Sequence, residues 1–298
     1  MMRRRIDGVL LLDKPLEVSS NGALQRAKRL FCAAKAGHTG TLDPLASGLL
    51  PICFGEATKF SAMMLDADKV YRAVLKLGQT TATGDAEGEI LERRNVALDE
   101  KQVEAVLERF RGEIGQVPPM HSALKHKGKP LYAYIRAGVE IARQERRVTI
   151  HDIVMDRFSD DELHLSVRCS KGTYVRVLAE DIGKSLGCGA HLKGLVRTGI
   201  GPFDLGEAFT LDEIGKREDR DAMLLPCDVL LRQFEKLVVG EADARFLTSG
   251  RAVEVPAGQG IYRLYDVGNR FLGLVEAGED GKIRPKRMMS GDSQAISA

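Results

Sequence analysis

The chain has 298 residues, of which 44% are hydrophobic and 29% charged, and its formal net charge is +2. This balance is typical of a soluble globular protein, and the length suits one large or two ordinary domains. No apolar run approaches the ~18 residues of a membrane span, and the run after the basic start MMRRRID has only about four residues, too few for a signal peptide. We therefore expect a cytoplasmic protein without a membrane segment.

The N-terminal third shows patterns for a strand, two helices and a second strand. GVLLLDKP (8–15) predicts a strand, and Ser19–Asn21 then offers an N-cap for a helix with one apolar face. A second helix is expected near 56–65. The alternation in KVYRAVLKLGQ (69–79) predicts a strand with Tyr71 on its buried face.

The middle of the chain continues this mixture. Asp99 and Gln102 resemble a capping box before a helix, while RVTIHDIVMDRF and ELHLSVRCS resemble paired strands. The second of these runs into SKGTYVRVLAEDIGKSLGCG, a predicted helix that stops at Gly187. Because strands and helices mix without a regular βαβ period, we expect an α+β fold with a mixed, largely antiparallel sheet flanked by helices.

The sequence pattern changes beyond about Pro226, where glycines become frequent. Short β-like runs such as KLVVG, IYRLYDVG and FLGLVEAG recur among glycines with turns every 8–12 residues or so, which is typical of a small barrel. The polar stretch 212–226 is interpreted as a linker. These patterns predict one domain over 1–226 and a second, smaller domain over 231–298.

A basic segment between His121 and Arg147 contains Tyr132 and Tyr134. Concentrated positive charge with aromatics suits a polyanion with exposed bases, although a solvated surface segment explains the charge equally well. The basic residues are Lys125, Lys127, Lys129, Arg136, Arg143, Arg146 and Arg147.

No metal site is expected. The five cysteines are scattered without a CxxC pair, which is typical of buried reduced thiols in the cytoplasm. The nearest approach to a metal motif is Cys188 with His191, and without a second ligand pair it is more typical of a turn.

Reactive side chains are densest in GHTGTLDPLASG (37–48). This stretch lacks the GxxxxGK[ST] and GxGxxG patterns, so nucleotide binding is not expected. Its glycines, threonines and Pro44 also suit a purely structural turn. A histidine, two hydroxyls and a carboxylate on so constrained a loop nevertheless favour a platform that presents Asp43 to a substrate.

Extended to GHTGTLDPLASGLLPICFGEATK, this stretch resembles the central motif of the pseudouridine synthases, and in particular the TruB-type bacterial tRNA pseudouridine-55 synthases. Further motifs similar to that family follow one another over most of residues 8–205. They are GVLLLDKPLEVSSN, KVYRAVLKLGQTTATGDAEG, PPMHSALKHKGKPLYAYIRAG, VRCSKGTYVRVLAEDIG and GCGAHLKGLVRTGIGPF. The C-terminal segment is similar to a PUA domain, a small RNA-binding barrel.

The resemblance implies a pseudouridine synthase fold over 1–226, with an RNA-gripping insertion at about 119–147, and a PUA-like domain over 231–298. The implied reaction isomerises uridine 55 in the T loop of tRNA. The C1′–N1 bond breaks, the uracil rotates, and C5 bonds to the same sugar carbon. This chemistry implies no cofactor, and the implied partner is the T stem-loop of tRNA, bound by a monomer.

The resemblance also implies roles for single residues. Asp43 is the implied catalytic carboxylate, which adds to the sugar or removes a C2′ proton; both routes need an ionised Asp. A charged Asp in a dry pocket requires a cation, and the family's partner is Arg176. Lys14 and Lys59 are implied as supporting residues, near the active-site loop and the RNA face.

Four further residues are implied to bind the substrate. Tyr71 is implied to stack on the flipped uracil, and Tyr174 and Leu195 to complete the pocket. His38 is implied to fill the space that the base leaves in the RNA loop. Without the family, the first three are more typical of core packing, and His38 suits a turn residue equally well.

Three functions of different classes stay open. The chain is a T-loop uridine isomerase, an enzyme of the same chemistry on another RNA, or a non-catalytic RNA-binding or RNA-folding module. The insertion at 119–147 favours the first over the second. The presence of Asp43, Tyr71 and Arg176 together disfavours the third.

Overall fold

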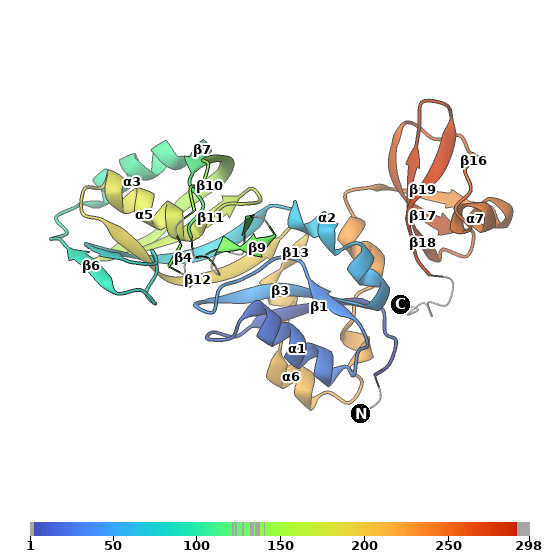
Figure 1. Ribbon diagram of the computed structural model, residues 1–298, viewed down its shortest axis with the longest axis horizontal. Coiled ribbons are helices and arrows are strands. Elements are labelled where there is room, and N and C mark those ends of the chain that lie inside the picture. The colour runs from blue at the N-terminus through green and yellow to red at the C-terminus, as the bar shows by residue number, and fades with distance from the viewer. Residues whose placement is uncertain are drawn as a thin grey trace.

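The computed structural model describes residues 3–290 except 121, 123, 127, 132, 133, 135–137 and 140 (Figure 1). A ten-stranded mixed sheet and a separate five-stranded sheet organise the described chain. The predicted α+β class with a largely antiparallel central sheet is confirmed. In the described part of the chain, no helix is long and apolar enough to cross a membrane.

The large sheet has a main path of eight strands, with β2 (Ala36–His38) and β13 (Phe203–Asp204) paired to its side. In spatial order the path is β14 (Phe209–Thr210), β1 (Gly8–Lys14), β3 (Ala46–Phe54), β12 (Ala190–Ile200), β4 (Lys69–Leu77), β11 (Glu162–Cys169), β10 (Arg146–Ser159) and β7 (Gly112–Gln116). Strand β12 pairs parallel with β3 and antiparallel with β4, so it joins the two halves of the sheet.

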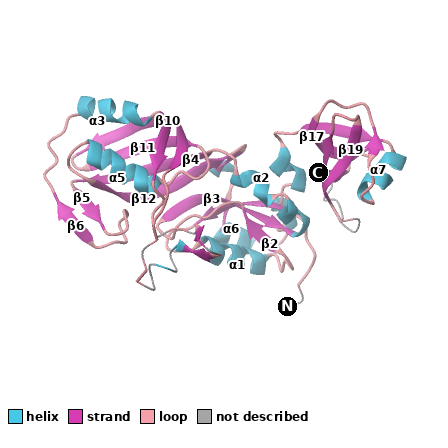
Figure 2. Ribbon diagram, turned by 45° about the horizontal axis from the view of Figure 1, so that its top comes forward, coloured by secondary structure: helices cyan, strands magenta, loops and turns pink. Residues whose placement is uncertain are grey.

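Helices cover different parts of this sheet (Figures 1 and 2). Helices α3 (Glu100–Leu107) and α5 (Val175–Ser185) pack against the half that contains β4, and α1 (Ser20–Leu30) and α6 (Leu211–Lys216) pack against β1 and β3. Two small hairpins, β5 (Gln79–Thr81) with β6 (Ile90–Arg93) and β8 (Lys125–His126) with β9 (Lys129–Pro130), lie outside the large sheet.

Local sequence signals explain several of these elements. The hydroxyl of Ser19 accepts from the backbone N–H of Gly22 and caps α1, and Asp99 and Gln102 form the predicted capping box of α3. Strand β4 buries alternate residues, Tyr71 among them, as its pattern predicts. Helix α5 ends before Gly187, which adopts a left-handed conformation.

Other predictions are wrong in detail. The helix expected near 56–65 is a 3-10 helix at Gly55–Lys59 followed by the short α2 (Ser61–Leu65). The supposed linker 212–226 is packed: Ile214 of α6 is buried against α1, and Leu225 pairs with Val9 of β1. Charged residues stand between these apolar positions, so the stretch is polar on average. For this reason its sequence resembles a linker although its apolar side chains are packed. The stretch PLYAYIRAG (130–138), whose pattern also predicts a short helix stopped by Gly138, lies largely outside the described residues.

The five-stranded sheet curls into a half-barrel, as expected for a PUA-like domain (Figure 1). Its order is β15 (Glu235–Val239), β17 (Gly260–Asp266), β18 (Phe271–Ala277), β19 (Lys282–Met288) and β16 (Val253–Glu254), with α7 (Glu241–Thr248) beside it. Phe271 packs on Phe60 at a ring distance of 5.6 Å, and Lys59 Nζ donates to Met288 O at 3.0 Å. These contacts fasten the small sheet to the large one.

The close approach of β3 to β12 requires glycine at position 48. Gly48 has φ +97°, and a Cβ there would lie 2.4 Å from the carbonyl oxygen of Arg197. We expect Gly48→Ala to lower the free energy of unfolding by more than ~2 kcal/mol, because the strand would have to move and the new residue would be strained. Urea denaturation of both proteins measures this loss.

Gly215→Ala is the matched control, because Gly215 lies in α6 with open space around it. Alanine favours a helix interior over glycine by ~1 kcal/mol, so this variant should be at least as stable as the wild type. Equal stability of Gly48→Ala and the wild type would contradict the close contact between the strands.

Candidate active site

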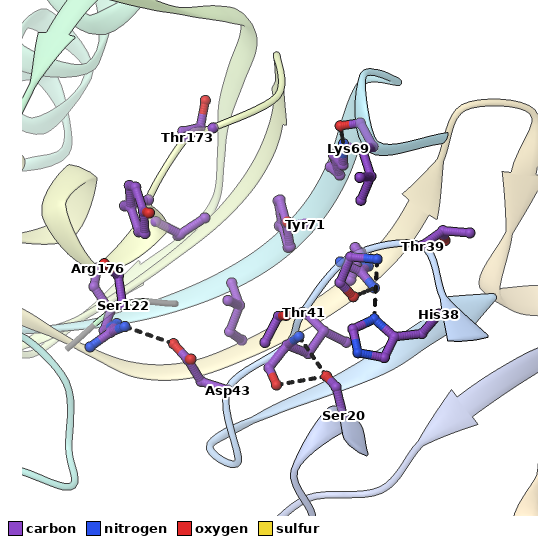
Figure 3. Close-up of a pocket in the computed structure, with 18 of the residues that line it drawn as sticks. Ser20, His38, Thr39, Thr41, Asp43, Lys69, Tyr71, Ser122, Thr173 and Arg176 are labelled. Atoms are coloured by element: carbon purple, nitrogen blue, oxygen red, sulfur yellow. Dashed lines mark hydrogen bonds and ion pairs between the residues drawn. The ribbon is translucent and has the colours of Figure 1, made fainter. Parts of the chain in front are cut away.

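A cavity of about 550 Å³ opens where the loop after β2, the strands β4 and β12, and the start of α5 meet (Figure 3). Six residues singled out in the sequence line this cavity together, although they are spread over more than half of the chain. They are His38, Asp43, Tyr71, Tyr174, Arg176 and Leu195. Lys14 and Lys59 are not among the lining residues.

The loop that carries Asp43 is held from several sides. Ser20, at the start of α1, is buried; its hydroxyl accepts from Leu42 N at 2.7 Å and donates to Leu42 O at 2.9 Å. On the other side, Asp43 O accepts from Ala46 N and Pro44 O accepts from Glu17 N. The backbone on each side of Asp43 is thus anchored, which limits the positions its carboxylate can take.

Arg176 lies between two carboxylates. Its Nη2 is 2.9 Å from Asp43 Oδ2, and its Nη1 is 3.4 Å from Asp85 Oδ2. The side chains of Arg176 and Asp85 are only 8% and 4% exposed, whereas that of Asp43 is 46% exposed. The buried partner of the guanidinium is therefore Asp85, and the carboxylate of Asp43 faces the open cavity.

This distribution of burial differs from the dry carboxylate expected at Asp43. Arg176 cannot be removed without leaving the buried Asp85 unpaired, so its loss costs several kcal/mol through Asp85 more than through Asp43. Asp85 was missed in the sequence, where TTATGDAEG suggested only a polar turn. The carboxylate among threonines was the available signal: Thr83 Oγ1 and Glu87 N both donate to Asp85 Oδ1.

Arg176 reaches the cavity because of how α5 begins. Tyr174 is the N-cap residue, and no side chain caps the helix there. Gln116 of β7 instead braces this point, since its amide accepts from Tyr174 N at 3.0 Å and donates to Tyr174 O at 3.3 Å. Two residues later, Arg176 is in the first turn of the helix and extends towards Asp43.

Tyr71 and Leu195 come from the adjacent strands β4 and β12. Tyr71 is buried and lies directly across from Arg197, two residues beyond Leu195. Burial raises the pKa of the Tyr71 hydroxyl, and the charge of Arg197 acts against this rise. Together with Tyr174, these side chains provide apolar and aromatic surface beside the Asp43 carboxylate.

Basic side chains around the cavity are buried without a carboxylate partner in the described chain. Lys14 Nζ donates to Pro15 O and Val18 O, and burial lowers the pKa of Lys14 to about 8. Lys69 Nζ likewise donates to Leu65 O and Ala67 O, and burial lowers its pKa to about 8. Because Lys14 has no exposed surface, it holds the chain behind the Asp43 loop and does not reach solvent.

Two hydroxyls at the cavity have no hydrogen-bond partner within the described structure. Thr39 and Ser122 are both buried and both line the cavity, and Ser122 lies near Arg176 in Figure 3. His38 is at the opposite side, where its Nδ1 accepts from Gly40 N at 3.4 Å. Burial lowers the pKa of His38, and the charge of Arg197 acts in the same direction.

The basic insertion is described only in part. Ser122 and Leu124 connect it to the cavity, while Lys127, Tyr132 and Arg136 lie outside the described residues. Lys59 is distant from the cavity lining and forms an ion pair with Glu56 at 2.6 Å. Within the described ranges, no group of three or more His, Cys, Asp or Glu side chains is arranged to hold a metal ion.

Comparisons with known proteins cover most of the chain. Residues 28–175 match the TruB family pseudouridylate synthase N-terminal domain, 176–232 match the tRNA pseudouridylate synthase B C-terminal domain, and 236–289 match the C-terminal domain of pseudouridine synthase II TruB. The tRNA pseudouridine synthase B of Azoarcus sp. is 56% identical over 291 residues, which cover 97% of this chain and 96% of that protein. That of Methylobacillus flagellatus is 53% identical and covers 97% of each chain.

Solved structures show the same fold. A chain in the crystal structure of a Cbf5–Nop10–Gar1 complex superimposes with a TM-score of 0.70 at 26% identity, covering 91% of this chain and 78% of that chain. A chain in the archaeal box H/ACA sRNP Nop10–Cbf5 complex gives a TM-score of 0.72 at 23% identity, covering 96% and 87%.

The buried Lys14 makes a prediction about pH. Below pH 8 this lysine is charged in both states, and its burial penalises the native state. Between pH 8 and its ordinary pKa of 10.5 the unfolded chain binds more protons at this site than the native protein, so the penalty is relieved as the pH rises. Relative to Lys14→Met, the wild type should therefore gain stability between pH 7.5 and 9.5.

Urea denaturation of both proteins at the two pH values measures this difference, and the comparison between variants cancels the titration of other groups. A stability difference that does not change with pH would contradict a lowered pKa at Lys14.

Proposed function

The chain belongs to the TruB family of pseudouridylate synthases and isomerises uridine to pseudouridine in tRNA, and we propose that its target is uridine 55 of the T loop. The observation that carries this proposal is the pairing of Asp43 with Arg176 at the wall of a cavity of about 550 Å³. A cavity of this size accommodates a nucleoside, and its half-exposed carboxylate is free to meet a sugar.

The proposed reaction needs one ionised carboxylate and a base that stays bound. The C1′–N1 bond breaks, the uracil turns while held, C5 bonds to C1′, and the C5 proton is lost while N1 gains one. Asp43 adds to the sugar or removes the C2′ proton; in both routes it must be charged, and the adjacent guanidinium of Arg176 favours that state.

The base must first leave the stacked T loop, at a cost of a few kcal/mol. We propose that Tyr71 stacks on the extruded uracil and that Leu195 and Tyr174 enclose it. Their common location at the cavity supports this assignment. His38, at the opposite side of the same loop as Asp43, is proposed to occupy the space that the base vacates in the RNA.

Recognition of the T stem-loop is assigned to the insertion at about 119–147. Two residues of this insertion, Ser122 and Leu124, line the cavity. Three of its basic residues, Lys129, Arg146 and Arg147, are exposed. Phosphate contacts from these residues would make tRNA binding weaken steeply with salt. We propose that a monomer is the active form. The cytoplasm stays the predicted location, in line with five cysteines that are all free thiols.

Replacing the proposed catalytic group tests the mechanism. We expect Asp43→Asn to abolish tritium release from C5-labelled uridine in unmodified tRNA, because the amide neither adds to the sugar nor removes a proton. Binding of tRNA should stay within about tenfold of the wild type, since the amide keeps the shape of the loop.

The control is Asp156→Asn, which changes an exposed carboxylate that accepts from Ser166 on the far strand pair. It should leave the rate unchanged. Substantial activity in Asp43→Asn would exclude the proposed role of the carboxylate.

The target nucleotide is tested separately. A hairpin that contains only the T stem and loop should be a substrate, because the proposed contacts all lie within that arm. Mapping of the altered nucleotide should place the pseudouridine at position 55. A hairpin that stays unmodified while whole tRNA reacts at another position would assign the enzyme a different site.

A further inference from the structure

Arg197 is absent from the roles proposed so far, yet it is the largest of the fully buried side chains, at 1% exposed. Arginine is rarely buried without a charged partner. Among the described residues, no carboxylate lies within ion-pair distance of this guanidinium. Its position at the cavity therefore requires an explanation other than a salt bridge.

Backbone carbonyls take the place of a counter-ion. Arg197 Nε donates to Leu49 O at 2.7 Å, and Nη2 donates to Gly40 O at 3.3 Å. Gly40 precedes Asp43 in the loop and Leu49 follows it in β3. One rigid guanidinium thus fastens the two ends of the segment that presents Asp43.

The same side chain contacts the strand that carries Tyr71. In the sheet register, Arg197 of β12 lies opposite Tyr71 of β4 on one side and opposite Gly48 of β3 on the other. Residues directly opposite in paired strands have their side chains on the same face. Burial raises the pKa of the Tyr71 hydroxyl, and the charge of the Arg197 guanidinium acts against this rise.

We propose that Arg197 is a positioning residue for the isomerisation: it couples the loop of Asp43 to the ring of Tyr71, so that the carboxylate meets the ribose while the ring holds the uracil. This inference rests on the proposed function of the site. Arg197 donates to both ends of the Asp43 segment and lies directly opposite Tyr71 in the sheet register. The planar fork of arginine suits such a task, because it donates in several fixed directions at once.

The chemistry explains why such a coupling matters. The base is detached from its sugar during the reaction and must be held relative to the carboxylate while it turns. Reacting groups have to be held within about 0.5 Å, and a displacement of ~1 Å lowers the rate of a reaction by ~10²-fold. A clamp between the two groups controls the distance on which the reaction depends.

Single-turnover kinetics on C5-tritiated tRNA test this role with Arg197→Lys. Lysine keeps the charge but loses the fork, so we expect the rate constant of tritium release to fall about 10²-fold while the tRNA dissociation constant changes less than about threefold. With enzyme in excess, partial misfolding lowers only the concentration of active enzyme. The rate constant at saturation therefore reports the geometry of the folded fraction.

Arg220→Lys is the matched control. Arg220 also clamps two backbone carbonyls, donating to Ile214 O and Gly215 O at 2.9 Å each, but it does so at α6, outside the cavity lining. This variant should lose thermal stability and keep the wild-type rate constant.

A second variant keeps the test decisive if Arg197→Lys folds poorly. Tyr71→Phe removes the hydroxyl on which the charge of Arg197 acts and keeps the ring, so we expect a rate constant about tenfold lower. In the double variant the two losses should be less than additive, because both break the same coupling.

A wild-type rate constant in either single variant, or full additivity in the double variant, would overturn the proposal. Equal losses in rate and tRNA affinity would also overturn it, since Arg197 would then act in RNA binding. Failure of the proposed function looks different: the wild type itself would release no tritium from tRNA.

Discussion

A buried guanidinium that has to be neutralised connects the parts of this site. Arg176 comes from the start of α5, Asp85 from the turn after β5, and Asp43 from the loop between β2 and β3. Desolvating a charge costs several kcal/mol unless its partners are well placed, so these segments can fold together only in an arrangement that satisfies all three charges. The ion pairs therefore constrain the sheet halves and the α5 terminus as well as the loop that carries Asp43.

Unequal burial within this triad has a functional consequence. Asp85 and Arg176 are enclosed by protein, whereas half of the Asp43 side chain faces the cavity. The cation is thus fixed before substrate binds, and no reorganisation is needed when a nucleoside covers the carboxylate. Removal of water then strengthens the attraction between the two groups, because the local dielectric constant falls. The cavity is therefore open enough for a base and a sugar, while the positive charge of Arg176 keeps its fixed position beside Asp43.

A structural feature could be predicted from the sequence where the residues that cause it are close together along the chain. The cap at Ser19, the capping box at Asp99 and the alternation around Tyr71 each act within a few residues, and the elements they predict are present. Strands β3 and β12 were not predicted, because Gly48 and Gly199 within them are typical of turns. Here Gly48 lets the backbone of β12 approach, and Gly199 makes room for the side chain of Val70. The grouping of Asp43 with Arg176 came from the family resemblance alone. Asp85 and Arg197 were not singled out, since the ion-pair partner of Asp85 and the carbonyls that Arg197 contacts lie more than ninety positions away along the chain.

The buried cations complete the electrostatics of the cavity. Lys14, Lys69 and Arg197 each satisfy their donors with backbone carbonyls, and within the described chain none has a carboxylate ion-pair partner. Carbonyl dipoles solvate a cation but leave its net charge, so the interior around the cavity stays positive. Such an arrangement lowers stability, as the reduced pKa of about 8 at both lysines indicates. In the proposed reaction, these positive charges would attract the polyanionic RNA and stabilise the negative charge that the uracil acquires when its bond to the sugar breaks. The buried cations therefore lower the stability of the fold, and in the proposed reaction they stabilise the charge that develops at the uracil.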